Sequence, residues 1–114
     1  MEVLGLVFAA TPTERRAEMT AFAAGVLGLE RLDAPDMGAA LFGLPDGAFL
    51  AVAGPRGPGD TERSIGFLVA DVAAAVEELR AAGVEVDAPS ENERFRYTHF
   101  RAPDGKLYEL VEKR

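Results

Sequence analysis

A turn sequence that occurs twice constrains the fold of this chain more than any other feature. Pro45-Asp46-Gly47 and Pro103-Asp104-Gly105 each lie three residues after a Phe, and each precedes an apolar, strand-like run. A repeat at about half the length of a 114-residue chain indicates one supersecondary unit used twice. The two copies differ in polarity, because Leu41 and Ala51 in the first correspond to His99 and Glu109 in the second.

Both halves predict the same order of elements: strand, helix, strand, strand, strand. The first half is expected to form strands at 3–8, 29–32, 39–43 and 48–52, and the second at 64–70, 84–86, 93–101 and 106–112. Ser90-Glu91-Asn92-Glu93 is expected to be a polar loop. Pro103 and Gly105 suit the second and fourth positions of a type I turn.

The two predicted helices have recognisable ends and apolar faces. Thr11 is expected to cap the first, which Gly28 ends, and Asp71 to cap the second, which Gly83 ends. Their core-facing residues follow helical spacing: Met19, Phe22, Ala23 and Val26 in the first, Val72, Ala75, Val76 and Leu79 in the second. The chain is therefore expected to be one α+β domain of two modules, about 1–53 and 64–114, joined by a Gly/Pro-rich linker at 54–63.

Composition narrows the class of protein. The formal net charge of −7 argues against binding to nucleic acid, which needs clustered Lys and Arg. No apolar run approaches the roughly 20 residues that cross a bilayer, and the start of the chain lacks the pattern of a signal peptide. The absence of Cys excludes disulfides and thiolate chemistry. A cytoplasmic location, away from membranes, is the simplest expectation.

Several segments in this order resemble the vicinal oxygen chelate superfamily, which includes glyoxalase I, extradiol dioxygenases, and fosfomycin-resistance and bleomycin-binding proteins. They are the run from Phe22 to Leu29, Ile65-Gly66-Phe67-Leu68-Val69-Ala70-Asp71-Val72, Ala81 to Val86, and Phe100 to Gly105 leading to Glu109-Leu110. The resemblance implies two βαβββ modules whose mixed sheets curl around a cavity, usually completed in a homodimer.

The family's metal site is incomplete in this sequence. Members that use a metal hold it through His, Gln and Glu side chains on the first and last strands of the modules. Those positions correspond here to Val3 or Gly5, to Ser64 and to Glu109. Only Glu109 keeps a ligand type, and one carboxylate is too few for a divalent site. No cofactor is therefore expected.

Strand alternation predicts which residues line the cavity. Phe95, Tyr97, His99 and Arg101 should share a face with Leu107 and Glu109, while Tyr108 and Leu110 face the helices. Ser64 and Leu68 are expected to join them, with apolar walls that also include Val3, Val7 and Leu50. A few polar groups in an apolar concavity are typical of a small-molecule site.

Each of these polar residues has a plainer interpretation. A lone His is commonly packed or on the surface, and Tyr97 is suited to filling the cavity mouth. Arg101 is either a solvated strand-end charge, a partner of Glu109 or a clamp for an anionic ligand. Beside Glu109, however, His99 would be suited to general acid–base chemistry.

The sequence supports two main hypotheses on function. The first is a metal-independent homodimer that binds a small organic ligand, as the bleomycin-binding and drug-resistance branch of the family does. The second is a lyase, isomerase or dioxygenase that uses His99 and Glu109, with or without a divalent metal. A regulatory module that uses the cavity as a sensor remains a third possibility, which the sequence does not separate from the first.

Overall fold

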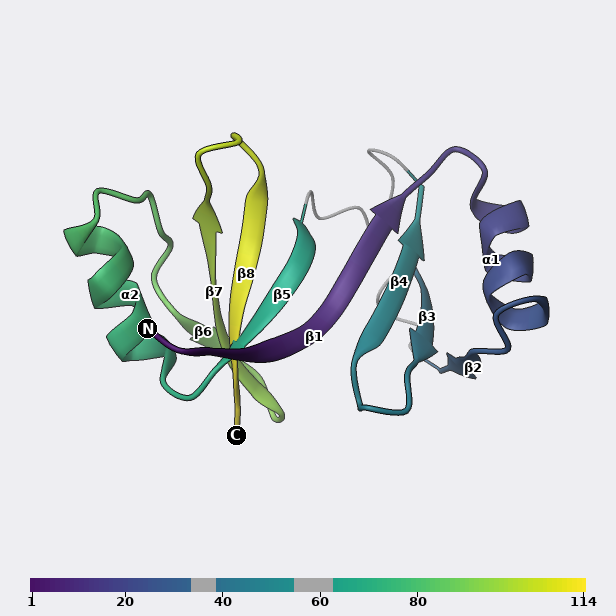
Figure 1. Cartoon of the computed structure of the whole chain (residues 1–114), viewed down its shortest axis with the longest axis horizontal. Coiled ribbons are helices and arrows are strands. Elements are labelled where there is room, and N and C mark those ends of the chain that lie inside the picture. Colours follow the sequence, from purple (N-terminus) through teal and green to yellow (C-terminus); the bar gives the residue numbers. More distant parts are fainter. Residues whose placement is uncertain (34–38, 55–62) are drawn as a thin grey trace. The chain divides into compact units, whose positions relative to one another are not determined.

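The described part of the chain contains ten elements in the predicted order. The structure is a computed structural model that describes residues 1–33, 39–54 and 63–114, without the side chains of 63 and 64. The elements are β1 (Val3–Pro12), α1 (Arg16–Gly25), β2 (Glu30–Leu32), β3 (Ala40–Gly43), β4 (Phe49–Ala53), β5 (Arg63–Val69), α2 (Val72–Ala81), β6 (Ser90–Glu91), β7 (Phe95–Arg101) and β8 (Leu107–Lys113) (Figure 1). The α+β class and the repeated βαβββ order are thus confirmed.

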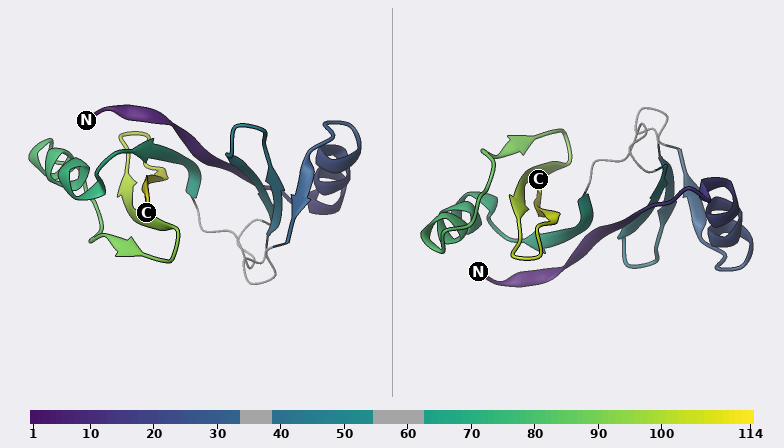
Figure 2. Two further views of the ribbon diagram at one scale, coloured as in Figure 1. Left: turned by 90° about the horizontal axis from the view of Figure 1, so that it is seen from below. Right: turned by 90° about the horizontal axis from the view of Figure 1, so that it is seen from above.

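The chain forms two compact units, and β1 contributes one half to each. Residues Phe8–Ser64 make up the first unit, in which the strand order is β2-β3-β4-β1. The second half of β1 runs parallel to β4, with Phe8 opposite Phe49, while β3 pairs with both β2 and β4 in antiparallel fashion. Helix α1 packs against β3 and β4 over a core of Ala23, Ala40, Phe42 and Val52 (Figure 2).

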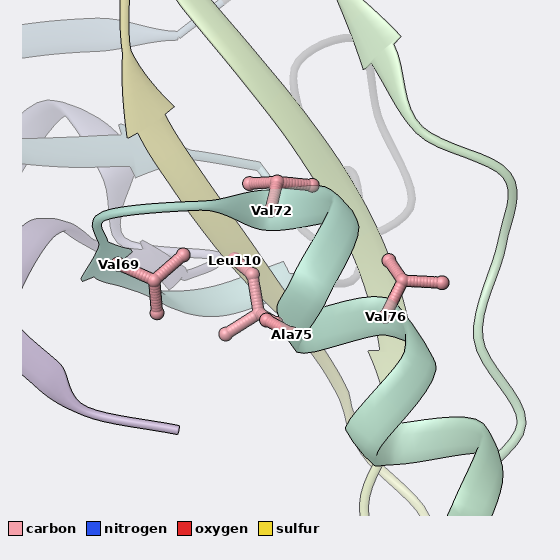
Figure 3. Packing of buried hydrophobic residues seen from close by; sticks show 5 residues of the cluster. All are labelled: Val69, Val72, Ala75, Val76 and Leu110. Atoms are coloured by element: carbon pink, nitrogen blue, oxygen red, sulfur yellow. The ribbon is translucent and has the colours of Figure 1, made fainter.

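The other unit contains Met1–Val7 and Ile65–Arg114, with the strand order β1-β5-β8-β7-β6. Helix α2 packs against β7 and β8. Its apolar face forms a core with two strands, as Figure 3 shows for Val69, Val72, Ala75, Val76 and Leu110. The predicted Asp71 cap is confirmed, since its Oδ1 accepts a hydrogen bond from the Ala74 N–H at 3.0 Å. Neither helix in the described part is long and apolar enough to span a bilayer.

The two Pro-Asp-Gly turns have the same hydrogen bonds. The Gly47 N–H donates to the Leu44 carbonyl oxygen, and the Gly105 N–H donates to that of Ala102, which closes each four-residue turn. In each turn the Asp side chain accepts from the backbone N–H two residues later, at 2.9 Å. The sequence repeat is therefore a structural repeat, and differences between the hairpins lie in the side chains on their strands.

The first helix differs from its prediction at both ends. Thr11 does not cap it, because β1 continues through Pro12. Thr11 is therefore a strand residue, paired with Val52 of β4. The N-cap position is Arg15, with no side-chain cap. The apolar stripe is also shorter than expected: Ala23 is buried, but Phe22 is 45% exposed and Val26, beyond the last helical residue, is 71% exposed.

The segment before β7 was also predicted incorrectly. Val84-Glu85-Val86 is not a strand, since only Val86 forms an isolated bridge, to Phe100. The polar loop expected at 90–93 instead begins with β6, in which Ser90 pairs with Tyr97 and Glu91 with Arg96. Most of the expected linker, 55–62, lies outside the described residues.

Candidate functional site

The register of β7 and β8 determines which side chains share a face. Tyr97 lies opposite Val111, His99 opposite Glu109 and Arg101 opposite Leu107. Because side chains alternate along a strand, these pairs lie on one face, and the Thr98–Leu110 and Phe100–Tyr108 pairs lie on the other.

The second face is the one against α2. Leu110 and Phe100 both belong to the apolar cluster that includes α2 residues, and the Tyr108 ring stacks between those of Phe67 and Phe100. The face with Tyr97, His99, Arg101 and Glu109, here called the polar face of the hairpin, is therefore turned away from α2. The predicted alternation is confirmed.

His99 and Glu109 are brought together on the polar face. The imidazole Nε2 lies 3.6 Å from Glu109 Oε2, and the Glu109 residue is only 8% exposed. The Tyr97 ring is tilted against the His99 ring, with their centroids 5.7 Å apart. These are not the only interactions of His99 and Glu109. A buried carboxylate beside an imidazole and a phenol can accept and donate hydrogen bonds to a bound molecule.

The Asp87 carboxylate also contacts the His99 ring. The sequence analysis did not identify Asp87 as a site residue. Its Oδ2 lies 3.4 Å from the imidazole Nδ1, on the side of the ring away from Glu109. The position of Asp87 directly after Val86 could have indicated this contact. Val86 packs with the α2 cluster, so alternation turns the Asp87 side chain toward the opposite face. The missed residue belongs to a segment whose pairing was itself predicted incorrectly.

Arg101 is held by its own hairpin. Its Nη1 donates a hydrogen bond to the Gly105 carbonyl oxygen at 2.7 Å, and the residue is exposed. This contact places the guanidinium at the end of the polar face that is nearest the turn, four residues along β7 from Tyr97. A solvated charge that stabilises the turn is the simplest description of this arrangement.

The other predicted site residues lie at the ends of strands or on β5. Phe95 is half-buried opposite Lys113, and Leu107 is half-buried opposite Arg101. Leu68 is half-buried on β5, which also contains the backbone of Ser64. Leu50, expected as an apolar wall of the cavity, instead packs with the α1 core and matches Tyr108 in the repeat.

The second turn has an electrostatic contact that the first lacks. The Tyr108 hydroxyl donates a hydrogen bond to Asp104 Oδ2 at 2.6 Å. This bond, together with the Lys106 backbone N–H, lowers the pKa of the Asp104 carboxyl. The same bond raises the pKa of the Tyr108 phenol, to which burial also contributes. The contact ties the turn of the hairpin to the strand that carries Glu109.

Comparison with known proteins now identifies the family. A sequence model described as the Glyoxalase/Bleomycin resistance protein/Dioxygenase superfamily matches residues 5–110. The chain belongs to this superfamily. The search of curated proteins gave no match.

Solved structures share the superfamily fold at low sequence identity. A methylmalonyl-CoA epimerase from Mycobacterium tuberculosis is 21% identical with a TM-score of 0.70, over 96% of this chain and 88% of that one. A Streptomyces coelicolor methylmalonyl-CoA epimerase is 22% identical with a TM-score of 0.66, over 97% and 98%. A superfamily member from Vibrio splendidus 12B01 is 18% identical with a TM-score of 0.62, over 94% and 97%. At these identities the likeness establishes the fold alone.

Within the part of the chain that the structure describes, the residues at the superfamily's expected ligand positions do not make up a divalent-metal site. Val3 and Gly5, on β1, carry no donor side chain, and Glu109 is the single carboxylate at an expected ligand position. Among residues 1–33, 39–54 and 63–114, no group of three or more His, Asp and Glu side chains is placed to hold a metal ion. A divalent site needs about three such ligands, so no chemistry is assigned to a metal here.

Proposed function

We propose that this superfamily member is a metal-independent, cytoplasmic protein that binds a small organic ligand through the polar face of its second hairpin. The observation that carries the proposal is the Glu109 carboxylate, buried next to His99 and Tyr97 on the face away from α2. The half-buried imidazole and phenol beside this buried carboxylate give the face both donors and acceptors of hydrogen bonds, which suits a small organic ligand.

The difference between the two hairpins supports this assignment. In the first hairpin, the positions that match His99 and Glu109 are Leu41 and Ala51, which lie opposite each other in the same register. The first hairpin thus shows that the fold requires no polar pair at these positions. Because the scaffold is the same in both copies, the polar residues of the second are best explained by a task other than folding.

Native mass spectrometry of the freshly purified chain tests the proposal. We expect a retained organic molecule, which a Glu109→Ala variant loses while keeping its fold. Elemental analysis of the same sample should show no stoichiometric Zn, Mn, Fe or Ni. A bound metal that is required to keep the organic molecule would contradict metal independence.

We also propose that the ligand-binding form is a homodimer. Both faces of the first half of β1 carry exposed apolar side chains, since Val3 is exposed on one face and Leu4 and Leu6 are exposed to the same degree on the other. Soluble proteins rarely leave such a surface uncovered, so a second copy of the chain is a natural partner.

An enzyme is the second candidate, favoured by one specific observation. The 3.6 Å separation of His99 Nε2 and Glu109 Oε2 places two proton-transfer groups side by side, and apo distances of this kind tighten when a substrate binds. Such a site would take a proton from carbon next to a carbonyl and return it, as an isomerase does. Proton NMR in D2O, with a panel of carbonyl compounds that have acidic α protons, would detect this exchange. If His99→Ala and Glu109→Gln leave every observed exchange unchanged, the enzyme hypothesis fails.

A further inference from the structure

Asp87 is anchored beside His99 by its backbone. Its N–H donates a hydrogen bond to the His99 carbonyl oxygen at 2.9 Å, and its own carbonyl oxygen accepts one from the Thr98 hydroxyl at 2.7 Å. Thr98 is buried, so this second bond is partly shielded from water. The position of the Asp87 Cα is therefore fixed by two bonds to consecutive residues of β7.

An irregularity in the pairing places Asp87 at this point. Val86 pairs with Phe100 and Ser90 pairs with Tyr97, so residues 87–89 cover the stretch that only residues 98 and 99 cover on β7. The connection from Val86 to β6 thus has one residue more than the facing stretch of β7, and it contains Pro89, which has no backbone N–H to give to a ladder. The mismatch breaks the regular pairing between these two segments at Asp87.

The three side chains then form a row across the sheet. Asp87 Oδ2 faces the Nδ1 side of the imidazole at 3.4 Å, and Glu109 Oε2 faces the Nε2 side at 3.6 Å. In a neutral imidazole one ring nitrogen carries the proton and the other is an acceptor, and a hydrogen-bond partner selects which. A carboxylate accepts only, so the nitrogen that it contacts is favoured as the protonated one.

We infer that Asp87 is a positioning residue that holds the proton of neutral His99 on Nδ1. Nε2 is then the ring nitrogen that carries the lone pair, so it is the one suited to accept a hydrogen bond from a donor on a bound molecule. Asp87 is assigned this role because its backbone N–H is hydrogen-bonded directly to the carbonyl oxygen of His99 and its Oδ2 lies 3.4 Å from Nδ1, although its side chain is 69% exposed and that of Glu109 is the more buried. The inference rests on the proposed function, since it describes how the ligand-binding imidazole is oriented.

The sequence makes the test unusually direct. His99 is the single His of the chain, so the ring nitrogens of uniformly 15N-labelled protein give one unambiguous set of long-range 1H–15N correlations. Spectra of the ligand-free full chain are recorded over a pH series, and the tautomer is read where the ring-nitrogen shifts no longer change as the pH rises, because the ring is then neutral. We expect the protonated-type shift on Nδ1 and the unprotonated type on Nε2.

Two substitutions at Asp87 and one control complete the design. In Asp87→Ala we expect the ratio of Nδ1-protonated to Nε2-protonated ring to fall about tenfold, as loss of a charge-assisted hydrogen bond implies. Asp87→Asn keeps an acceptor oxygen and should restore part of the ratio. Glu85→Ala removes an exposed carboxylate two residues earlier and should leave the ratio unchanged.

The result that overturns the inference is also clear. A wild-type ring protonated on Nε2, or the same tautomer ratio in wild type and Asp87→Ala, would show that Asp87 does not set the proton position. Amide spectra of each variant establish that the fold is kept. Failure of the proposed function is a separate result, because it appears as the absence of a retained molecule in native mass spectrometry and does not change the tautomer measured without ligand.

Discussion

One side chain gives the second turn a hydrogen bond that its counterpart in the first turn is unable to make. Tyr108 bonds to Asp104, whereas its counterpart in the first hairpin is Leu50, which packs in a core. In Tyr108→Phe we expect the melting temperature at neutral pH to fall by a few degrees, because the ring stacking with Phe67 and Phe100 is kept and only the hydrogen bond is lost. Thermal unfolding followed by circular dichroism measures this.

The pH dependence of that difference has a defined sign. The pKa of Asp104 is lowered in the folded chain, so its contribution is present above the ordinary Asp value of about 4 and is lost as pH falls through the folded value. The pKa of Tyr108 is raised, so its contribution is present below about 10 and is lost as pH rises through the folded value. The gap between wild type and Tyr108→Phe should therefore be flat from about pH 5 to 9 and close at both extremes. A gap that grows at either extreme would contradict this account.

Glu112 stabilises the start of α2 from a distant strand. Its Oε2 accepts a hydrogen bond from the Val72 N–H at 2.8 Å, and Val72 is fully buried. The Glu112 side chain is 20% exposed, so the bond is partly shielded. We expect Glu112→Ala to lower the free energy of unfolding by about 1–3 kcal/mol, because the helix N–H loses its acceptor. Urea unfolding measures the change.

The matched control for this prediction is Glu77→Ala on the same helix. Glu77 pairs with Arg80 at 3.1 Å, but its side chain is largely exposed. An exposed ion pair contributes little, so the control should change stability by less than about 0.5 kcal/mol. Equal losses of unfolding free energy in the two variants would mean that the hydrogen bond from Val72 to Glu112 stabilises the chain no more than an exposed ion pair does.

At the scale of elements, the end of α1 allows a test of backbone conformation alone. Gly25 and Gly28 both have open space where a Cβ would lie, but only Gly28 has a positive φ, +68°. We expect Gly25→Ala to stabilise the chain by about 0.5–1 kcal/mol, since Ala restricts the unfolded chain and favours the helix. Gly28→Ala should destabilise it by about 1–2 kcal/mol, because the left-handed region disfavours a side chain. Opposite signs in urea unfolding are the expected outcome; equal signs would contradict it.

The elements that the sequence predicted well are those with local signals. The Asp71 cap, the apolar face of α2 and both Pro-Asp-Gly turns depend on residues a few positions apart, and all are confirmed. The expected Thr11 cap was wrong because pairing with β4, some forty residues later, extends β1 through it. The irregular pairing of residues 86–91 with β7 depends on which residues of β7 are already paired, and no local pattern reports that.

The candidate site follows the same division. Alternation along β7 and β8 was sufficient to place His99 and Glu109 on one face, once the turn had set the register. Asp87 was missed because its place depends on the irregular pairing of residues 86–91 with β7. Leu50 was misplaced because the sequence analysis did not use its match to Tyr108 in the repeat. Residues joined by a tight turn were therefore predictable, and a residue brought in from a neighbouring segment was not.

For the whole molecule, the exposed apolar half of β1 leads to the last prediction. Leu4 and Leu6 are 52% and 53% exposed, although they lie in a regular strand. If a second copy covers them, light scattering at micromolar concentration gives the mass of two chains. Leu4→Lys combined with Leu6→Lys should then shift the mass toward one chain, because two charges would have to be buried in the interface.

Leu44→Lys is the matched control for the dimer prediction, since Leu44 is also an exposed apolar residue but lies at the turn between β3 and β4. It should leave the mass at two chains. Circular dichroism of both variants separates dissociation from unfolding, because charges on an exposed strand face cost little in a folded single chain. A wild-type mass of one chain would rule out the dimer, and an unchanged mass in the double variant would place its interface elsewhere. Native mass spectrometry of the double variant then asks whether ligand retention requires the second copy.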